Sequence, residues 1–409
     1  MQSMLGLAVL STLLVAGCAT SGGSAPAAST ATRPQLSASQ AAEHTPAAYF
    51  ARSGSVDALK ADAWDPVANG IGDVKGFKPA FTVAADGSGT HKSVQEALDA
   101  AVAKGGTERL YILVKPGTYR GQTCLKGGAP VTLYGLDDDA GKVVIVDNKS
   151  NGTPKDKAVT LNACEGRSGA DSYGTSGSSS FLAYADGFQA KNLTFSNDFD
   201  EQSAQRGLQA VAITTRGDKL IFENVRFLGN QDTLQVSSPS VGVIARSYFS
   251  NVYIEGDVDY VFGRGIAVFD KAEFKSVARE RAEGSGYVFA PSHAQLYPYG
   301  FLAMNSKFTS DGKLAAGSAS LGRAWDDSSG AFKAADGKTY LPNGMTVIRN
   351  SVIGTHINAV SPWSGAASTN RAFSADKPVT IQFGNPKVDT EFPANRLYES
   401  GNSGPGAAK

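Results

Sequence analysis

Two acidic residues interrupt an apolar stretch, GDVDYVFGRG, which runs from Gly256 to Gly265. The valines and aromatic residues around them favour a buried β-strand, whereas an ionised carboxylate resists burial unless a partner compensates for its lost hydration. Either Asp257 or Asp259 could therefore have a chemical role. An Asp at a solvated strand end is the commoner case, so this stretch alone leaves both interpretations open.

Other acids and amides recur at intervals that would suit stacked coils. Asp232, in GNQDTL, precedes Asp259 by 27 residues, and Gln209, in LQAVAI, precedes Gln231 by 22 residues. If each interval were one coil of a parallel β-solenoid, strands about 4.8 Å apart would bring these side chains together. One of two close carboxylates can stay protonated while the other acts as a nucleophile or base, and amides can donate to an oxyanion. The set could catalyse acyl transfer, although a polar ladder on the outside of a solenoid explains the spacing equally well.

A short pattern recurs along the chain and predicts the fold. It consists of a small or polar residue, two variable residues and an aromatic or aliphatic residue, as in NLTF, NVRF, RSYF, KAEF, NSKF and NSVI, which begin at residues 192, 224, 246, 271, 305 and 350. The last positions lie 22 to 45 residues apart, which favours a parallel solenoid over a β-sandwich with turns every 8 to 12 residues or so. We therefore predict an all-β, right-handed parallel β-helix. An amphipathic helix at Ser93–Ala103, with Ser at the N-cap position, is expected to cover its N-terminal end.

Composition narrows the class of protein. The 38 basic and 38 acidic residues leave no net charge, so the chain has no general attraction to nucleic acid or to an anionic membrane surface. Forty-six glycines are typical of a turn-rich β-protein. We expect a monomer that does not bind nucleic acid.

The N-terminus, MQSMLGLAVLSTLLVAGCAT, reads as an export signal. Its apolar run from Leu5 to Ala16 is too short to span a bilayer as a mature helix. The VAGC tetrapeptide ending at Cys18 resembles a bacterial lipobox, although no Lys or Arg precedes the apolar run; otherwise Cys18 is an ordinary residue of a signal peptide. We interpret residues 1–18 as a lipoprotein signal peptide and, with Ala19 after the cysteine, expect a lipid anchor in the outer membrane.

The remaining chain divides into three parts by composition. Residues 19–46 are mostly Ala, Ser, Thr, Gly, Pro and Gln, and predict a disordered tether. Residues 47–79 form an N-terminal extension, and we expect residues 80–409 to form the β-helix domain. Cys124 and Cys164 could pair in an exported domain or stay buried and unpaired, and their spacing fits no zinc motif. No cofactor or metal is expected.

Histidine and tryptophan residues add little to the chemistry. The four histidines, at positions 44, 91, 293 and 356, are scattered, and none lies beside a Ser or Cys in a nucleophile motif. A Ser-His-Asp hydrolase is therefore not expected. Trp363 could line a cleft or cover an edge of the solenoid, and we favour the edge.

Eight sequence blocks, in one order, carry a resemblance to a known family. They are FTVAADGSGTHKSVQEALDA, GTYR, YGTSGSSSFLAYADGFQAKNLTFSN, LQAVAI, GNQDTL, GDVDYVFG, LGRAW and NRLYESGNSGPGA. Over about residues 80 to 406 the chain resembles the pectinesterase (pectin methylesterase) family, and with the lipobox it is most similar to the bacterial outer-membrane lipoprotein branch. The resemblance implies a carboxylic ester hydrolase that removes methyl esters from pectin, whether polygalacturonate or oligogalacturonates.

The resemblance also implies roles for the polar residues. Asp259 matches the family's nucleophile, which attacks the ester carbonyl. Asp232 matches the acid that protonates departing methanol and then acts as base on the water that resolves the acyl-enzyme. Gln209 and Gln231 match the amides at the oxyanion, and Arg323 of LGRAW matches the arginine that keeps the nucleophile ionised and oriented.

The same comparison by position gives expected substrate contacts. Trp325 matches the aromatic platform for the sugar, and Thr175 and Phe262 match positions in the substrate cleft. Asp257 matches no functional position, so we expect it to be solvated.

The chain also departs from the family pattern. Gly121 stands where Glu is usual, Ala324 replaces a proline and Tyr260 replaces a frequent Phe, which leaves the cleft shape and the substrate open. The same machinery could act on another small ester or thioester, and a catalytically silent carbohydrate-binding β-helix is the alternative outside enzymes. Retention of all five catalytic positions argues against silence. A lyase would need an acidic calcium cluster and a glycosidase its own acid pair, and no convincing set of either is present.

Overall fold

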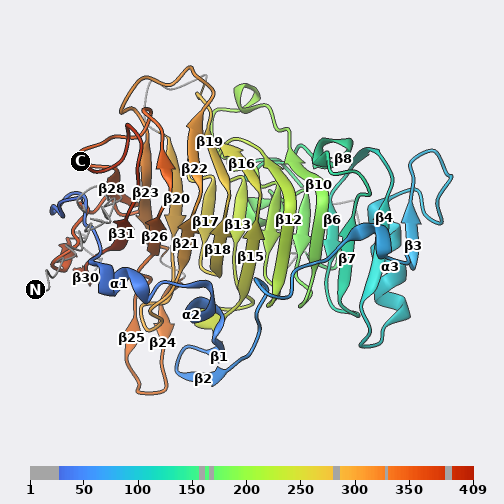
Figure 1. The fold of residues 1–409 in the computed structure, drawn as a ribbon, viewed down its shortest axis with the longest axis horizontal. Helices are drawn as coiled ribbons and strands as arrows, with labels where there is room; N and C mark the ends of the chain where they lie inside the picture. Colours follow the sequence, from blue (N-terminus) through green and yellow to red (C-terminus); the bar gives the residue numbers. More distant parts are fainter. Residues whose placement is uncertain (1–26, 156–161, 165–169, 280–285, 328–329, 383–388) are drawn as a thin grey trace, which may run out of the picture.

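The protein is a long solenoid of stacked parallel strands (Figure 1). The computed structural model describes residues 27–155, 162–164, 170–279, 286–327, 330–382 and 389–409. Sequence colours follow one another along the long axis, because each coil packs on the coils before and after it. The predicted parallel β-helix is confirmed. The signal peptide and Cys18 lie outside the described residues.

One face of the solenoid is an eight-stranded parallel sheet, in which neighbouring strands come from successive coils. Its strands, in sheet order, are β6 (Thr123–Leu125), β9 (Phe181–Ala183), β11 (Ile213–Thr215), β13 (Leu234–Val236), β17 (Val261–Gly263), β20 (Tyr287–Pro291), β23 (Ser320–Trp325) and β28 (Trp363–Ala367).

The other faces form a sixteen-stranded sheet that bends around the core. β10 shows the bend, since its first residues pair with β7 and its last residues pair with β8. The strands are β3 (Phe81–Val83), β4 (Leu110–Val114), β5 (Gly117–Arg120), β7 (Val131–Tyr134), β8 (Val143–Asp147), β10 (Gln189–Asn197), β12 (Leu220–Leu228), β15 (Arg246–Ser250), β16 (Tyr253–Gly256), β18 (Ile266–Asp270), β19 (Glu273–Ser276), β21 (Phe301–Met304), β22 (Lys307–Ser310), β26 (Met345–Arg349), β27 (Val352–Ile353) and β31 (Arg396–Ser400).

The recurring sequence pattern marks the corner between two faces. Its first residue has a positive φ, which Asn tolerates better than most residues, and its last residue is buried and in register with the same position of the next coil. The assignment of RSYF to this pattern was wrong, because the corner of that coil is NVYI, Asn251–Ile254. Phe249 of RSYF is an equally buried aromatic, but it belongs to the preceding face and pairs with Phe222 and Phe269.

In the part of the chain that the structure describes, the helices are short, and the longest of them covers the N-terminal end of the solenoid. α3 (Val94–Lys104) begins at a capping box made by Ser93 and Glu96, and its buried side chains pack beside β3, β4 and β6. The predicted capping helix is thus present, one residue later than expected. The other helices are α1 (Ala38–Ala42), α2 (Pro46–Phe50), α4 (Gly174–Gly177) and the 3-10 turns η1 (Val74–Gly76), η2 (Ala140–Lys142) and η3 (Glu201–Ser203). Within the described residues, no helix is long and apolar enough to cross a membrane.

The N-terminal segment runs along the solenoid from its last coils towards its first (Figure 1). Arg33 makes a buried bidentate pair with Glu399 of β31, at 2.8 and 2.7 Å, and Arg246 of β15 binds Asp62. A disordered tether reaching residue 46 is therefore a wrong prediction for residues 33–46. Composition could not reveal an ion pair between residues 366 positions apart.

Three small antiparallel sheets are also present among the described residues. They consist of β1 (Arg52–Ser55) between β2 (Ala58–Ala61) and β14 (Val243–Ile244), of β24 (Phe332–Lys333) with β25 (Thr339–Tyr340), and of β29 (Val379–Ile381) with β30 (Thr390–Phe392).

The structure answers two questions that the sequence left open, the pairing of the two cysteines and the location of Trp363. Cys124 and Cys164 form a disulfide, with Cα atoms 5.8 Å apart, which ties β6 to the loop that follows β8. Trp363 begins β28, the last strand of its sheet, and is buried in the core at that edge.

Candidate functional site

Asp232 and Asp259 occupy equivalent positions on adjacent coils. β13 and β17 pair with Leu234 opposite Val261, and each aspartate stands two residues before its member of that pair. The Asp232 N–H donates to the Val258 carbonyl at 3.0 Å, which continues the register to the aspartates. Both have positive φ, 68° and 51°, and are 7% and 9% exposed. Backbone strain and burial of two acids at one place are features of functional sites.

Arg323 joins the pair from two coils further along. Its Nε and Nη2 donate to the two carboxylate oxygens of Asp259 at 3.0 and 2.7 Å, and its guanidinium lies 4.0 Å from the centre of the Tyr287 ring. The bidentate geometry and the stacked ring hold the guanidinium in one orientation. No motif in the sequence marks Tyr287 as a site residue, because only the pairing of β20 with β23 brings its ring against the guanidinium.

The electrostatic environments of the two aspartates differ. Burial, together with the charge of Asp259, raises the pKa of Asp232 well above its usual range. Burial also raises the pKa of Asp259, but the hydrogen bonds and charge of Arg323 oppose that shift. The protonated form is thus favoured more strongly at Asp232, whereas Asp259 is the member whose charged form Arg323 stabilises through two hydrogen bonds.

The two glutamines have their carbonyl oxygens occupied. Asn151 Nδ2 donates to Gln209 Oε1 at 3.1 Å and also to Thr175 Oγ1 at 3.1 Å, while Arg279 Nη2 donates to Gln231 Oε1 at 2.8 Å. Within the described part of the chain, neither Nε2 makes a hydrogen bond. Each carboxamide thus retains N–H donors, which is what an oxyanion requires.

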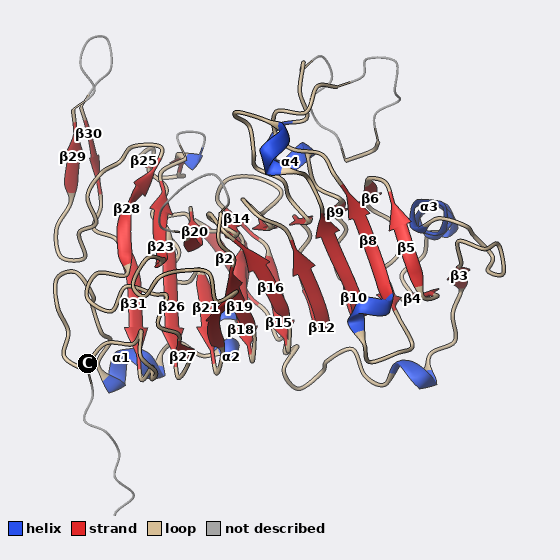
Figure 2. Cartoon of the chain, turned by 90° about the horizontal axis from the view of Figure 1, so that it is seen from above, coloured by secondary structure: helices blue, strands red, loops and turns tan. Residues whose placement is uncertain are grey.

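Thr175 lies on α4, in the loops that project from one side of the solenoid (Figure 2). The Asn151 bond to it ties these loops to the backbone of the Gln209 segment, since the Asn151 N–H also donates to the Gln209 carbonyl at 2.7 Å. Thr175 is thus linked to the site through Asn151, a residue that the sequence reasoning missed.

Phe262 and Trp325 form an aromatic patch on the same sheet. Their ring centroids are 5.9 Å apart in an edge-to-face arrangement, and they pack with Val211 and Ala290. Phe262 is buried and Trp325 is half-buried, so the indole is the more accessible of the two rings. Arg323 and Trp325 alternate with the fully buried Ala324 along β23 and therefore share the outer face.

Asp257 is not solvated as expected, and the prediction is wrong. Only 2% of the residue is exposed, because the Arg279 segment and η3 cover it. Its carboxylate accepts from the Val258 N–H at 2.5 Å, lies 3.5 Å from Arg279 Nε and is hydrogen-bonded to Glu201. Burial, and next the charge of Glu201, raises the pKa of Asp257 to about 7.

This raised pKa predicts a pH-dependent stability. Between the unfolded value near 4 and the folded value of about 7, the native state binds the proton more tightly, so the stabilisation is complete at low pH and is lost as pH rises to about 7. Asp257→Asn removes this contribution. We expect the melting temperature of the parent, relative to the variant, to fall between pH 4 and pH 8. A melting-temperature difference between parent and variant that stays constant across that range would contradict a protonated Asp257. Asp232 is present in both chains, so its titration changes both melting temperatures alike and does not affect the difference.

Comparison with known proteins places the chain among relatives of the same architecture. The Pectinesterase family model matches residues 80–334. A pectinesterase of Ralstonia solanacearum is 43% identical over 385 residues, 93% of this chain and 93% of the relative. The chain belongs to the pectinesterase family.

Solved structures of family members agree with the fold. The crystal structure of Escherichia coli YbhC has a TM-score of 0.76 and 32% identity, covering 92% of this chain and 96% of that one. Rice weevil pectin methyl esterase has a TM-score of 0.73 and 30% identity, covering 93% and 99%. A pectin methylesterase in complex with a hexasaccharide has a TM-score of 0.63 and 28% identity, covering 81% and 91%. YbhC is also a curated relative, 34% identical over 92% of this chain and 89% of its own, and is named a putative acyl-CoA thioester hydrolase.

The departures from the pectinesterase pattern lie mostly away from the exposed surface. Ala324 and Tyr260 are fully buried, and the Tyr260 hydroxyl lies 3.3 Å from Ser276 Oγ in the interior. Gly121 has a φ of 125°, a conformation that a Glu at this position would rarely adopt. Two of the three replacements therefore change the packing of the core, not the contacts on the outer face.

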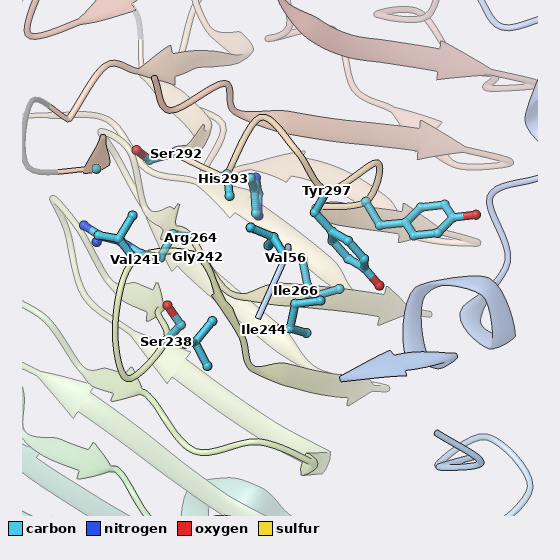
Figure 3. Close-up of a pocket in the computed structure, with 14 residues that line it drawn as sticks. Val56, Ser238, Val241, Gly242, Ile244, Arg264, Ile266, Ser292, His293 and Tyr297 are labelled. Carbon is cyan, nitrogen blue, oxygen red and sulfur yellow. The ribbon is translucent and has the colours of Figure 1, made fainter. Parts of the chain in front are cut away.

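A separate pocket of this pectinesterase-family chain lies where the N-terminal segment meets the solenoid (Figure 3). It holds about 20 Å³, and Val56, Ile244, Ile266, His293 and Tyr297 are among its lining residues. His293 Nε2 is 3.0 Å from the Gly265 carbonyl, its Nδ1 accepts from the Met345 N–H, and burial lowers its pKa to about 3. The histidine is a neutral residue that holds the backbone at Gly265 and Met345.

Proposed function

We propose that the protein hydrolyses methyl esters of pectin with Asp259 as nucleophile and Asp232 as acid and base. The observation that carries this proposal is a pair of buried aspartates on adjacent coils. Arg323 makes a bidentate hydrogen bond to Asp259 but not to Asp232. Because Arg323 binds Asp259 and not Asp232, Asp259 can be charged while the neighbouring Asp232 stays protonated. Membership of the pectinesterase family supports the same reaction.

The reaction follows from the positions of these groups. A carboxylate oxygen of Asp259 attacks the ester carbonyl carbon, and the carbonyl oxygen becomes an oxyanion that accepts from the Nε2 groups of Gln209 and Gln231. Asp232 gives its proton to the methoxy oxygen as the C–O bond breaks, which releases methanol and leaves an acyl anhydride on Asp259. Asp232, now ionised, takes a proton from the water that attacks this anhydride, and the free acid and both aspartates are restored.

Recognition of the sugar is assigned to the outer face of the sheet. The half-exposed Trp325 presents its ring beside Phe262 and on the same side of β23 as Arg323. Aromatic faces suit the apolar faces of sugar rings. Thr175, through Asn151, would bound the other side of the cleft near Gln209.

Methanol release provides the direct test. We expect the purified full-length protein to release methanol from highly methylated pectin and from methylated oligogalacturonates, and the ratio of the two rates gives the preferred chain length. The name carried by YbhC favours one competing activity, hydrolysis of an acyl-CoA thioester by the same residues. Release of free thiol from acyl-CoA without methanol from either pectin substrate would reject the pectin assignment in favour of that alternative.

We further propose that the protein is lipid-anchored in the outer membrane through Cys18. Support comes from VAGC, from the following Ala19 and from the Ala- and Ser-rich residues after it. Fractionation of cells that express the parent or Cys18→Ala tests the anchor. The parent is expected in the outer-membrane fraction and the variant in the soluble fraction, while identical membrane partition of both would place the anchor elsewhere.

A further inference from the structure

Arg279 lies beside the candidate site and contacts Gln231 directly. Its Nη2 donates to Gln231 Oε1 at 2.8 Å, and it lies 3.3 Å from Glu201 and 3.5 Å from Asp257. A guanidinium has donors and no acceptor, so the end of the carboxamide that faces it must be the oxygen. The contact therefore occupies the Oε1 end of the Gln231 carboxamide and leaves the Nε2 end for a ligand.

The orientation of this carboxamide matters to the proposed reaction. With Oε1 held by Arg279, the Nε2 donors are left without a hydrogen-bond partner in the described residues. A rotation of the amide by half a turn would present an oxygen to the developing oxyanion, and the interaction would change from attraction to repulsion. A fixed amide also needs no reorganisation when the oxyanion forms.

We propose that Arg279 is a positioning residue that holds Gln231 with its N–H groups towards the oxyanion, and that Asp257 and Glu201 hold Arg279. The proposal rests on the proposed function and assigns a role to three ionisable residues, Arg279, Asp257 and Glu201, that the sequence left without one.

Burial of the two acids supports this assignment. Asp257 and Glu201 have side chains only 2% and 10% exposed, and burying carboxylates is costly unless they have partners. Beside them is a cavity of about 360 Å³, lined in part by Asp200, Glu255, Asp311 and Lys313. Arg279, Asp257 and Glu201 also line this cavity, and among the described residues the acids that the Arg279 guanidinium contacts are Glu201 and Asp257.

A double-mutant cycle on turnover tests the proposal. Arg279→Lys keeps the positive charge for Asp257 and Glu201 but loses the planar fork that reaches Gln231. We expect kcat for methanol release to fall by about 10-fold or more while KM changes less than about 2-fold, since the loss concerns the transition state. In a Gln231→Ala background, the same Arg279→Lys substitution should change kcat by less than about 2-fold.

Each other outcome rejects the role of Arg279. Equal losses in both backgrounds would show that Arg279 acts independently of Gln231. A rise in KM alone would make it a substrate contact. If the Arg279→Lys chain fails to fold, Asp257→Asn replaces it in the cycle, because it keeps Arg279 but removes the carboxylate that faces Nε, and here too the loss must vanish in the Gln231→Ala background. A parent that releases no methanol contradicts the proposed function itself, whereas an active parent with additive losses contradicts only this inference.

Discussion

Asp259→Asn is expected to lower the turnover of methyl-esterified pectin by about 10⁴-fold or more, with the fold retained. An amide has nearly the size of the carboxylate but is a poor nucleophile, so the step that forms the acyl-enzyme is lost. Arg323 would lose its charged partner, but it remains stacked on Tyr287 and 21% of its side chain is exposed, so solvent can stabilise it. Methanol release and circular dichroism on the same sample measure the two effects.

Glu399→Gln provides the matched control for this substitution. Glu399 is also a buried carboxylate gripped by an arginine through two hydrogen bonds, but it lies at the C-terminal end of the solenoid. We expect it to lower the melting temperature and to leave turnover per folded molecule unchanged. Turnover at the parental rate in Asp259→Asn, with native circular dichroism, would remove Asp259 from the reaction.

Arg323→Lys is expected to lower kcat/KM by about 10²-fold while the melting temperature changes little. An ammonium keeps the charge but cannot bind both oxygens of Asp259 or stack flat on Tyr287, so the nucleophile loses its fixed position. Small displacements of a reacting group have effects of this order. Weaker stabilisation of the carboxylate should also raise the pKa of Asp259 further, so the acidic limb of the pH–rate profile should move to higher pH.

Arg33→Lys is the corresponding control, because Arg33 makes the same kind of bidentate pair far from the site. It should cost stability and spare turnover, the opposite of Arg323→Lys. If Arg323 were only an ion pair of the surface, its substitution would be nearly neutral in both measurements, since exposed pairs contribute about 0 to 1 kcal/mol. Parental turnover in Arg323→Lys would therefore exclude it from the site.

Sequence periodicity accounts for most of the fold. The recurring Asn and aromatic positions predicted a parallel solenoid because a left-handed corner residue and a buried residue three positions later recur in each coil. One coil was misread, since RSYF and NVYI both end in a buried apolar residue. Periodicity identifies what is buried, whereas the choice between two faces depends on which strands pair.

Spacing in the sequence is enough to bring Asp232 and Asp259 to adjacent coils, although it does not choose between a catalytic pair and a polar ladder. Asp232 and Asp259 stand at the same position relative to consecutive strands, and the pairing of a parallel sheet transmits that position from coil to coil. The amides and Arg323 entered through the resemblance of short motifs, and Arg323 does bind Asp259. Site residues within or next to regular strands could therefore be predicted from their spacing and from short motifs.

The contacts by which the loops complete the site depend on long-range packing. Arg279 and Glu201 lie 48 and 30 residues from Gln231 in the sequence, and Asp257 was expected in solvent, yet all three contact one another beside that glutamine. The N-terminal residues 33–46, which composition marked as disordered, are held by Arg33 and Glu399 across 366 residues. Loop lengths differ between coils and carry no period, so contacts that depend on where loops and termini pack are set by long-range charge pairing and burial, which a local pattern does not encode.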